Sequence, residues 1–314
     1  MKPKGKILVI RGGAIGDFIL TLPVLSALRR KYPDAHIEVL GYPHIAMLAQ
    51  AGGLAQAVRS IDSRGLARFF TRDAQLDLDL VCYFAGFDLI LSYLYDPAGV
   101  FRENVERCGQ TRYIQGPHRP DDTGHQHATE VLLKPLEQLA VFNADAEPHL
   151  RINPEWAAPY RGRWLACHPG SGSETKNWPE TQWATLLHRV LEETAWKILL
   201  VGGEAEGQRL ERLAVSWPPD RLCVARHLPL PQLAERLSGC TAFVGHDSGI
   251  SHLAAAVGLS GLVLWGHTNE TVWRPRSKQV RILREPAGLA HLQVGTVFAA
   301  LLQLVEQPRT FAVA

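Results

Sequence analysis

The sequence has no long uninterrupted run of apolar residues. A membrane-spanning helix needs roughly 18 to 20 of them, whereas Asp, Arg, Gly or Pro interrupts the longest apolar stretches of this chain. The first residues, MKPKGKILVIRGG, are basic, but their apolar segment is too short for the core of a signal peptide. They predict a first strand, and the sequence as a whole predicts a cytoplasmic protein.

The number of cysteines and the net charge are also low. The cysteines are odd in number and have no CxxC spacing, which argues against a disulfide framework or a zinc site and is typical of a reducing cytosol. They are Cys82, Cys108, Cys167, Cys223 and Cys240. The formal net charge is +2 and no nucleic-acid-binding signature is present, so no nucleic-acid partner is expected. Peripheral association with a membrane surface stays open. Arg29, Arg30 and Lys31 could form a local basic patch, although a solvated helix face explains them as well.

The chain has the length and the pattern of a two-domain α/β protein. Its 314 residues are many for one hydrophobic core, and in both halves buried-strand patterns alternate with helical ones, which predicts βαβ units and parallel sheets. The proline-rich stretch 143–162 predicts an interdomain linker. We therefore expect two Rossmann-like domains facing across a cleft, 1–157 and 158–314, with a hinge near Ala157–Gly162. The last helix is a candidate to pack back on the first domain.

The individual elements follow from the periodicity of the apolar residues. Pro23 should restart the first helix, because proline removes a backbone donor. The expected strands are Lys6–Ile10, His36–Leu40, Phe87–Tyr93, Trp164–His168, Trp196–Val201, Thr241–Gly245 and Gly261–Trp265. The expected helices are Asp17–Tyr32, Ile45–Ala51, His127–Leu139, Pro179–Glu192, Glu204–Trp217, Leu230–Leu237, Ser251–Val257 and Val294–Glu306.

A glycine-rich turn with Gly12, Gly13 and Gly16 follows the first strand and lets the backbone approach a ligand closely. Asp17 comes next, in the first turn of a helix, where the helix dipole favours an ionised carboxylate that can act as a base. Helix capping explains the same aspartate. A dinucleotide-binding GxGxxG pattern, and with it a nicotinamide-dependent oxidoreductase, would need glycine where Arg11 stands, although an acid follows at about the right distance.

Two further turns offer donors and an acid to a nucleotide. The stretch His168–Pro179 contains a hydroxyl-rich turn with Ser171, followed by Lys176 as a charge that could neutralise phosphate. It lacks the Gly-Lys-Ser/Thr of a P-loop, and an exposed lysine is the simpler explanation. After the next strand, Gly202 begins a turn that leads to Glu204, an acid placed to accept ribose hydroxyls or to cap a helix.

The segment Gly245–His252 predicts a diphosphate site, because a helix beginning near Ser248 would point unpaired N–H groups at its ligand. Capping by Asp247 or Ser248 is compatible with that role. A hydrolase triad drawn from His246, Asp247, Ser248 and His252 is not favoured, since no GxSxG pattern is present. We also assign no metal to the Asp77-Leu-Asp79 tripeptide, or to His125 and His127.

Four segments in series resemble the family 9 glycosyltransferases, the ADP-heptose:lipopolysaccharide heptosyltransferases and their relatives. They are RGGAIGDFILTLPVLSALRRKYPDAHI, HPGSGSETKNWPETQWATLL, VGGEAE and GHDSGISHLAAAVGLSGLVLWGHTNETVWRP. The resemblance implies a GT-B fold with an N-terminal acceptor domain and a C-terminal nucleotide-sugar domain. It also implies inverting, metal-independent transfer of a sugar, heptose from ADP-heptose, to a saccharide or glycolipid of the lipopolysaccharide core, without a cofactor. Another nucleotide sugar and a non-catalytic binding protein remain alternatives.

By motif match, Asp17 takes the position of the family's catalytic base in the loop of Gly12, Gly13 and Gly16. The donor-binding positions are Ser171, Lys176, Gly202, Glu204, Asp247, Ser248, Gly249, Ile250 and His252, with Lys176 near phosphate and Glu204 near ribose. The chain departs from the family pattern at Gly12-Gly13, where serine is common, and at His246, where asparagine or another small residue is common. The stretch 59–126, in the expected acceptor domain, carries no motif of the family.

Overall fold

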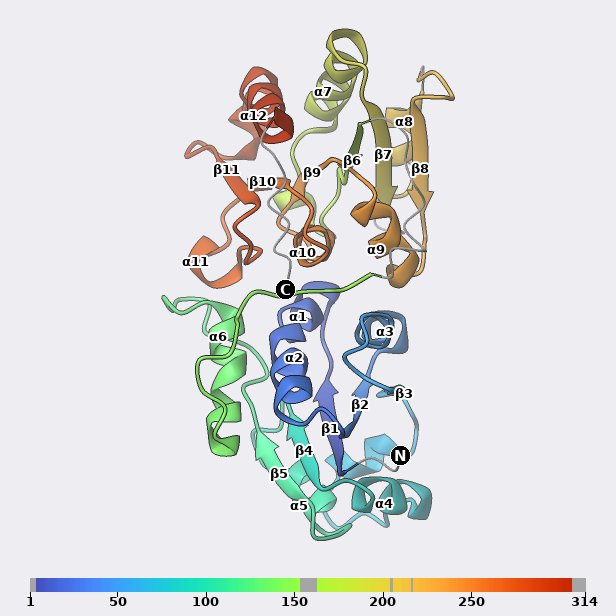
Figure 1. Ribbon diagram of the computed structural model, residues 1–314, viewed down its shortest axis with the longest axis vertical. Coiled ribbons are helices and arrows are strands. Elements are labelled where there is room, and N and C mark those ends of the chain that lie inside the picture. Colours follow the sequence, from blue (N-terminus) through green and yellow to red (C-terminus); the bar gives the residue numbers. More distant parts are fainter. Residues whose placement is uncertain (1–3, 153–162, 204–205, 216, 307–314) are drawn as a thin grey trace. The chain divides into compact units, whose positions relative to one another are not determined.

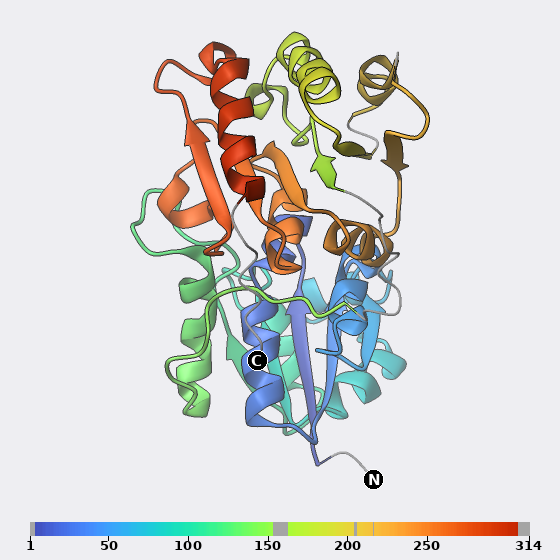
Figure 2. The same ribbon diagram turned by 45° about the horizontal axis from the view of Figure 1, so that its top comes forward.

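The computed structural model describes residues 4–152, 163–203, 206–215 and 217–306. The chain divides into two compact units, Met1–Ala146 (unit 1) and Glu147–Ala314 (unit 2). In each unit, helices lie on both faces of a parallel sheet (Figures 1 and 2). The α/β fold with two parallel sheets is therefore confirmed, while the expected hinge at Ala157–Gly162 lies outside the described residues. Within the described ranges no helix is long and apolar enough to cross a bilayer.

The sheet of unit 1 has five parallel strands in the order β3-β2-β1-β4-β5. They are β1 (Lys6–Arg11), β2 (His36–Gly41), β3 (Ala57–Ser60), β4 (Leu89–Ser92) and β5 (Arg112–Gln115). The central strand β1 is buried at five consecutive positions, as expected for a strand covered on both faces. The edge strands β3 and β5 are partly exposed and have no continuous apolar run, which explains why the sequence pattern did not predict them.

Proline divides two of the predicted helices of unit 1. Pro23 lies in the first turn of a second helix, so the expected Asp17–Tyr32 is two helices, and Pro135 changes the second half of the expected His127–Leu139 to a 3₁₀ turn. The helices are α1 (Ile15–Ile19), α2 (Leu22–Lys31), α3 (Pro43–Ala51), α4 (Leu78–Ala85), α5 (Val100–Glu106) and α6 (Ala128–Leu133), with 3₁₀ turns η1 (Leu66–Phe70) and η2 (Lys134–Leu139). Leu8 and Ile10 of β1 pack on aromatic residues of η1, α4 and α5.

The sheet of unit 2 has six parallel strands in the order β11-β10-β9-β6-β7-β8. They are β6 (Trp164–Cys167), β7 (Lys197–Gly202), β8 (Leu222–Arg226), β9 (Ala242–His246), β10 (Gly261–Trp265) and β11 (Val280–Arg284). The four central strands match the predicted ones within about two residues, while the partly exposed edge strands β8 and β11 were not predicted.

The helices of unit 2 pack on two hydrophobic clusters, one large and one small. The helices are α7 (Glu180–Glu193), α8 (Arg209–Ala214), α9 (Leu230–Ser238), α10 (Gly249–Ala256), α11 (Glu270–Trp273) and α12 (Val294–Glu306), with 3₁₀ turns η3 (Glu174–Lys176) and η4 (Leu289–His291). The large cluster includes residues of α7, α8 and α12, and the small one includes Ala255 of α10. Helix α12 contacts α7, β9 and β10. Helix α8 is shorter than the predicted Glu204–Trp217, because Glu206 and its neighbours form a turn before it.

Candidate functional site

Each sheet reverses its strand order at one point. In unit 1 the chain runs from β1 outwards through β2 to β3 and then returns to β4 beside β1; in unit 2 it runs from β6 outwards to β8 and returns to β9 beside β6. Open α/β sheets bind ligands at this switch point, outside the carboxyl ends of the two neighbouring strands. Most candidate site residues follow β1 in unit 1 and β6 and β9 in unit 2, so they lie at the switch points, while Gly202 ends the neighbouring strand β7.

In unit 1 the Asp17 carboxylate turns back onto the loop that precedes it. Asp17 is the third residue of α1, and its Oδ2 accepts the N–H of Ala14, 2.9 Å away, at the N-terminal cap position. Asp17 therefore caps the helix from inside its first turn and is not the cap residue itself. Its side chain is 32% exposed, so the carboxylate is partly open to solvent.

A buried arginine lies beneath this carboxylate. Arg11 Nη2 is 3.6 Å from Asp17 Oδ1, and Nη1 donates to the carbonyl of His118 at 2.7 Å. Burial lowers the pKa of Arg11, while the nearby Asp17 and the ring of Tyr93 oppose that shift. Because its Nη1 is held by a backbone carbonyl, the guanidinium keeps a fixed position beside the Asp17 carboxylate.

Gly13 is required by the geometry of this loop. Its φ is +98°, and a Cβ atom on it would lie 2.9 Å from Asp17 Oδ2. By contrast, a Cβ on Gly12 would meet no atom closer than 3.9 Å. Gly16 lies within α1. Gly13, unlike Gly12, is therefore a position where the missing side chain leaves room for the carboxylate.

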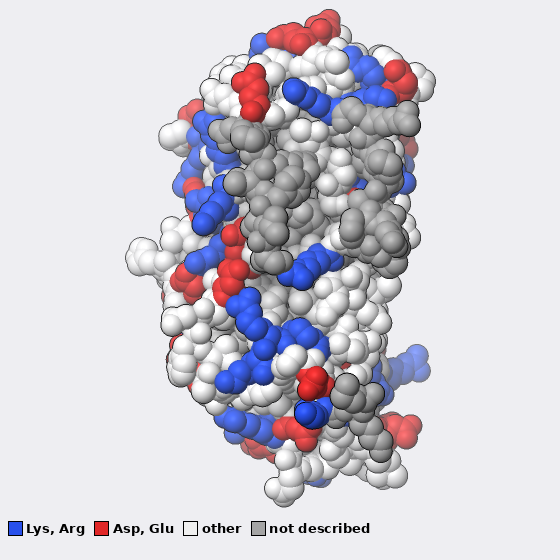
Figure 3. All heavy atoms as spheres, in the orientation of Figure 1, with Lys and Arg blue, Asp and Glu red and all other residues white. Residues whose placement is uncertain are grey.

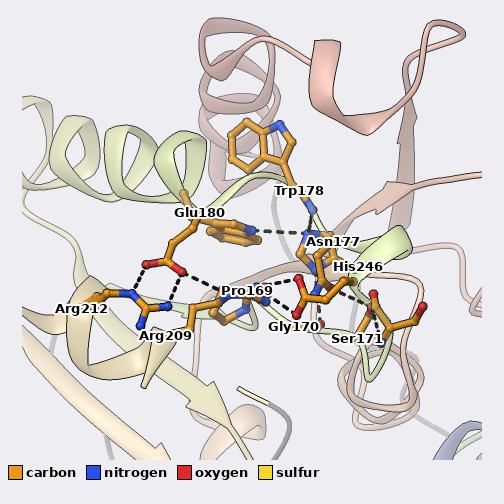
Figure 4. A network of polar contacts seen from close by, with 12 residues as sticks. Pro169, Gly170, Ser171, Asn177, Trp178, Glu180, Arg209, Arg212 and His246 are labelled. Carbon is orange, nitrogen blue, oxygen red and sulfur yellow. Dashed lines mark hydrogen bonds and ion pairs between the residues drawn. The ribbon is translucent and has the colours of Figure 1, made fainter. Parts of the chain in front are cut away.

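In unit 2 His246 holds both ends of the loop that follows β6 (Figure 4). Its Nε2 accepts the N–H of Trp178 at 2.8 Å and faces the indole N–H of Trp183 at 3.4 Å, while Nδ1 lies 3.3 Å from the carbonyl of Gly170. Because Nε2 accepts two N–H groups, the proton must be on Nδ1, which donates to Gly170. Burial lowers the pKa of His246 to about 3, so the ring is neutral at physiological pH.

The loop between these two anchors carries Ser171 and Lys176. Ser171 Oγ bonds to the carbonyl of Ser173 and to Asn177 Oδ1, which closes the hydroxyl-rich turn on itself. Lys176 Nζ lies 2.7 Å from Asp247 Oδ2. Lys176 is therefore not the solvated surface lysine of the simpler explanation, since it joins the loop after β6 to the loop after β9.

The helix N-terminus predicted at Ser248 is present. Ser248 is the cap residue of α10, but its hydroxyl makes no capping bond and lies 3.3 Å from His168 Nδ1. The N–H groups of Gly249 and Ile250, in the first turn, cannot bond within the helix and are available to an anion. His252 is buried in the second turn of the same helix.

Glu206 is a site residue that sequence reasoning missed. It is buried, with Oε1 3.4 Å from His168 Nε2, and its Oε2 accepts the N–H of Gly203 at 2.6 Å. Burial alone would raise the pKa of Glu206, but these hydrogen bonds outweigh it and the pKa falls to about 2. His168 thus lies between Glu206 and Ser248. The predicted ribose ligand Glu204 lies outside the described residues.

Glycine positions make room for Glu206. A Cβ on Gly170 would collide with the Glu206 carboxylate, and one on Gly202 would lie 2.5 Å from Leu210 and 3.1 Å from the Glu206 Cβ. Gly202, predicted from its motif, therefore acts through close packing at the end of β7.

An arginine network fixes the outer side of the same loop (Figure 4). Arg209 Nη1 donates to the carbonyl of Pro169, and its other nitrogens contact Glu174 and Glu180. Arg212 makes a second contact with Glu180 at 2.6 Å. The loop is thus tied to α7 and α8 as well as to β9.

The remaining polar candidates have structural roles or lie apart from the site. Asp77 caps α4 by accepting two N–H groups, and His127 caps α6 through Nδ1, whereas His125 is exposed. Among the described residues, no group of three or more His, Cys, Asp or Glu is arranged to hold a metal ion. In the basic run of α2, Arg29 is engaged with the carbonyls of Pro33 and Ala35 and with Gln56. Figure 3 shows acidic and basic side chains interspersed over one face.

Comparison with known proteins identifies the family. The model of glycosyltransferase family 9 (heptosyltransferase) matches residues 127–296. Lipooligosaccharide heptosyltransferase 2 of Haemophilus ducreyi is 31% identical over 313 residues, with 89% of this chain and 88% of that protein covered. This chain belongs to glycosyltransferase family 9. Lipopolysaccharide heptosyltransferase 1 of Pseudomonas aeruginosa is 28% identical over 294 residues, covering 84% of this chain and 79% of that protein.

The fold of this family 9 glycosyltransferase agrees with solved structures. E. coli heptosyltransferase WaaC with ADP-2-deoxy-2-fluoro heptose superposes with a TM-score of 0.74 at 18% identity, covering 95% of this chain and 99% of that one. The predicted GT-B architecture is thereby confirmed. Membership of the family also makes the chain a glycosyltransferase, so the oxidoreductase and the non-catalytic alternatives are not taken further.

Proposed function

We propose that this enzyme transfers heptose from ADP-heptose to a saccharide of the lipopolysaccharide core. The names of the similar proteins support this donor and this acceptor class, since they are lipopolysaccharide and lipooligosaccharide heptosyltransferases. We also propose that unit 2 binds the nucleotide sugar and unit 1 the acceptor. A peripheral position at the cytoplasmic face of the inner membrane would bring the enzyme to a lipid-linked acceptor.

The observation that carries the proposal is the arrangement at the switch point of unit 2. Lys176 and the turn of Ser171 lie in the loop after β6, and this loop meets the loop that leads from β9 into the first turn of α10. A cation and free backbone N–H groups are the groups that bind a diphosphate and stabilise it as it leaves. In the proposed mechanism they take the role that a metal ion has in other transferases.

The ion pair of Lys176 with Asp247 has a consequence for donor binding. In the free enzyme Asp247 neutralises Lys176 at 2.7 Å. A bound diphosphate would compete for the lysine and release the Asp247 carboxylate. The carboxylate could then accept hydrogen bonds from hydroxyl groups of the sugar. Ser248, Gly249 and Ile250 lie beside it in the same loop and would bind the diphosphate.

Asp17 is the proposed base. It takes the proton of the acceptor hydroxyl while that oxygen forms a bond to the anomeric carbon of the sugar. The bond from the anomeric carbon to the phosphate oxygen breaks on the opposite face, and ADP leaves with the electron pair, so the configuration inverts. The buried Arg11, with Nη2 3.6 Å from Asp17 Oδ1, would hold the carboxylate in position for this step.

The test combines a transfer assay with a base variant. We expect ADP-heptose and a deacylated core oligosaccharide to give ADP and a product of inverted anomeric configuration by NMR, with a rate that EDTA does not change. Asp17→Asn should lower kcat by about 10²- to 10⁴-fold and leave the Kd for ADP unchanged. Asp34→Asn, at an exposed aspartate of unit 1, is the control.

A nucleotide panel defines the donor independently. A ligand at about 100 times its Kd stabilises the native state by roughly 2.7 kcal/mol, which a thermal-shift assay detects. Selective stabilisation by ADP species supports the proposal. Selective stabilisation by UDP, GDP or dTDP species would show that the donor carries another nucleotide. Full activity of Asp17→Asn would show that Asp17 is not the base.

A further inference from the structure

Near the switch point of unit 1 lie two aromatic side chains that have no role in the proposed chemistry. Tyr95 follows the carboxyl end of β4, and His118 follows the carboxyl end of β5. The loop of Asp17 follows the carboxyl end of β1, the neighbour of β4 in the sheet. All three loops therefore leave the same edge of one parallel sheet, where ligands of this fold class bind.

A chain of contacts connects these aromatic residues to the proposed base. Arg11 approaches Asp17 with Nη2 and donates from Nη1 to the carbonyl of His118. The ring of His118 in turn lies edge-on to the ring of Tyr95, with centroids 4.6 Å apart. Arg11 therefore fixes the position of His118 relative to Asp17, and His118 supports Tyr95.

Tyr95 is exposed although its loop is held firmly. Its side chain is 65% exposed, whereas Tyr93, two residues earlier, is buried and donates its hydroxyl to the carbonyl of Leu132. The Gln115 amide donates to the carbonyls of Ser92 and Leu94, directly before Tyr95. On the other side Asp96 accepts the N–H of Arg102. The aromatic ring is thus presented to solvent from a fixed backbone, a preorganised arrangement that suits binding.

We propose that Tyr95 and His118 form a stacking subsite for a sugar ring of the acceptor, next to the hydroxyl that Asp17 deprotonates. The inference rests on the proposed function and extends it to the acceptor. A sugar ring has an apolar face of C–H groups that can pack on an aromatic face, while its hydroxyl groups stay at the edge in water. Tyrosine suits this position because it combines an apolar ring with a polar end.

A single exposed aromatic residue is common on protein surfaces, so the experiment needs a matched control. Phe142 is also in unit 1 and is 64% exposed, but no ring contact joins it to the network of Arg11. We would compare Tyr95→Ala, Tyr95→Phe and Phe142→Ala. The readouts are the Kd of deacylated core oligosaccharide by calorimetry with ADP present, the KM of acceptor and donor, and the Kd of ADP.

We expect Tyr95→Ala to weaken oligosaccharide binding and raise the acceptor KM by about 5- to 20-fold, as loss of one aromatic contact implies. Tyr95→Phe and Phe142→Ala should stay within about twofold of the wild type, and the Kd of ADP should not change in any variant. If the Kd of the oligosaccharide were the same for the wild type and Tyr95→Ala, the proposed subsite would be wrong. Normal transfer by Tyr95→Ala at low acceptor concentration would also show the subsite to be wrong and leave the proposed function intact. If oligosaccharide binding depended on Tyr95 but no sugar were transferred from ADP-heptose, the subsite would stand and the proposed donor would be wrong.

Discussion

His246 should make the stability of unit 2 depend on pH. Its pKa is lowered from 6.5 to about 3 in the folded chain, because burial disfavours the charged ring. Between these two values the unfolded chain binds a proton that the folded chain does not. The free energy of unfolding therefore has its full value, as far as His246 is concerned, above pH 6.5, and it decreases as the pH falls towards 3.

The size of the effect follows from the difference in pKa. Each pH unit below 6.5 removes about 1.4 kcal/mol, so the loss from His246 at pH 5 is about 2 kcal/mol. Glu206 contributes little in this window. Its pKa is about 2, so its stabilising effect is present above its ordinary value of 4.5 and is lost only as the pH falls towards 2. Between pH 8 and pH 5 the stability therefore changes through His246 and not through Glu206.

Urea unfolding followed by tryptophan fluorescence measures this directly. All 8 tryptophans lie in unit 2, from Trp156 to Trp273, so the signal reports that unit alone. At pH 8 we expect His246→Asn to be less stable by about 1 to 3 kcal/mol, because the buried N–H of Trp178 loses its acceptor. At pH 5 the difference from the wild type should shrink by about 2 kcal/mol, since asparagine does not titrate.

His188→Gln is the matched control, because His188 lies exposed on α7, where its ring faces Glu192 of the same helix. Its difference from the wild type should change much less with pH than that of His246→Asn. If the wild type and His246→Asn instead lost stability in parallel from pH 8 to pH 5, the neutral buried ring would be refuted, and with it the assignment of its hydrogen bonds.

Two further substitutions test the geometry of the site. Gly13→Ala should lower kcat by more than about tenfold, because the new Cβ would meet Asp17 Oδ2 and displace the base. Gly12→Ala should stay within about twofold, because its Cβ would meet no atom closer than 3.9 Å. Equal kcat values for both variants would show that the position of Asp17 is not critical. Lys176→Ala should weaken ADP binding by about 10- to 100-fold in calorimetry, as expected for a charge-assisted contact. Unchanged ADP affinity would remove Lys176 from the diphosphate site.

The central strands could be predicted from the sequence, and the edge strands could not. Strands such as β1 and β9 are buried along almost their whole length, which leaves a continuous apolar run in the sequence. Edge strands such as β5 and β8 each have only one buried residue among their four or five, and the others are exposed or partly buried. Such short segments acquire their strand conformation from pairing with a neighbour, which local sequence does not contain.

The candidate site was predictable where a motif brings its residues together in sequence. Asp17 and the turn before α10 were found because each lies in one short segment. His246 was noticed only as a departure from a pattern, since its partners Gly170 and Trp178 are 76 and 68 residues away. Glu206 had a weaker signal, an acid shortly after a glycine pair, but only the fold shows that it turns back to Gly203.

Both units fix a functional loop in the same physical way. In unit 1 the buried Arg11 donates to the carbonyl of His118, and in unit 2 the buried His246 donates to the carbonyl of Gly170. Every residue has a backbone carbonyl, so such contacts set the path of a loop without specifying its side chains. Neighbouring side chains such as Tyr95 can then change with the substrate while the loop keeps its path. The acceptor should therefore be determined by the exposed residues of these loops, and the position of the reacting groups by the buried residues beneath them.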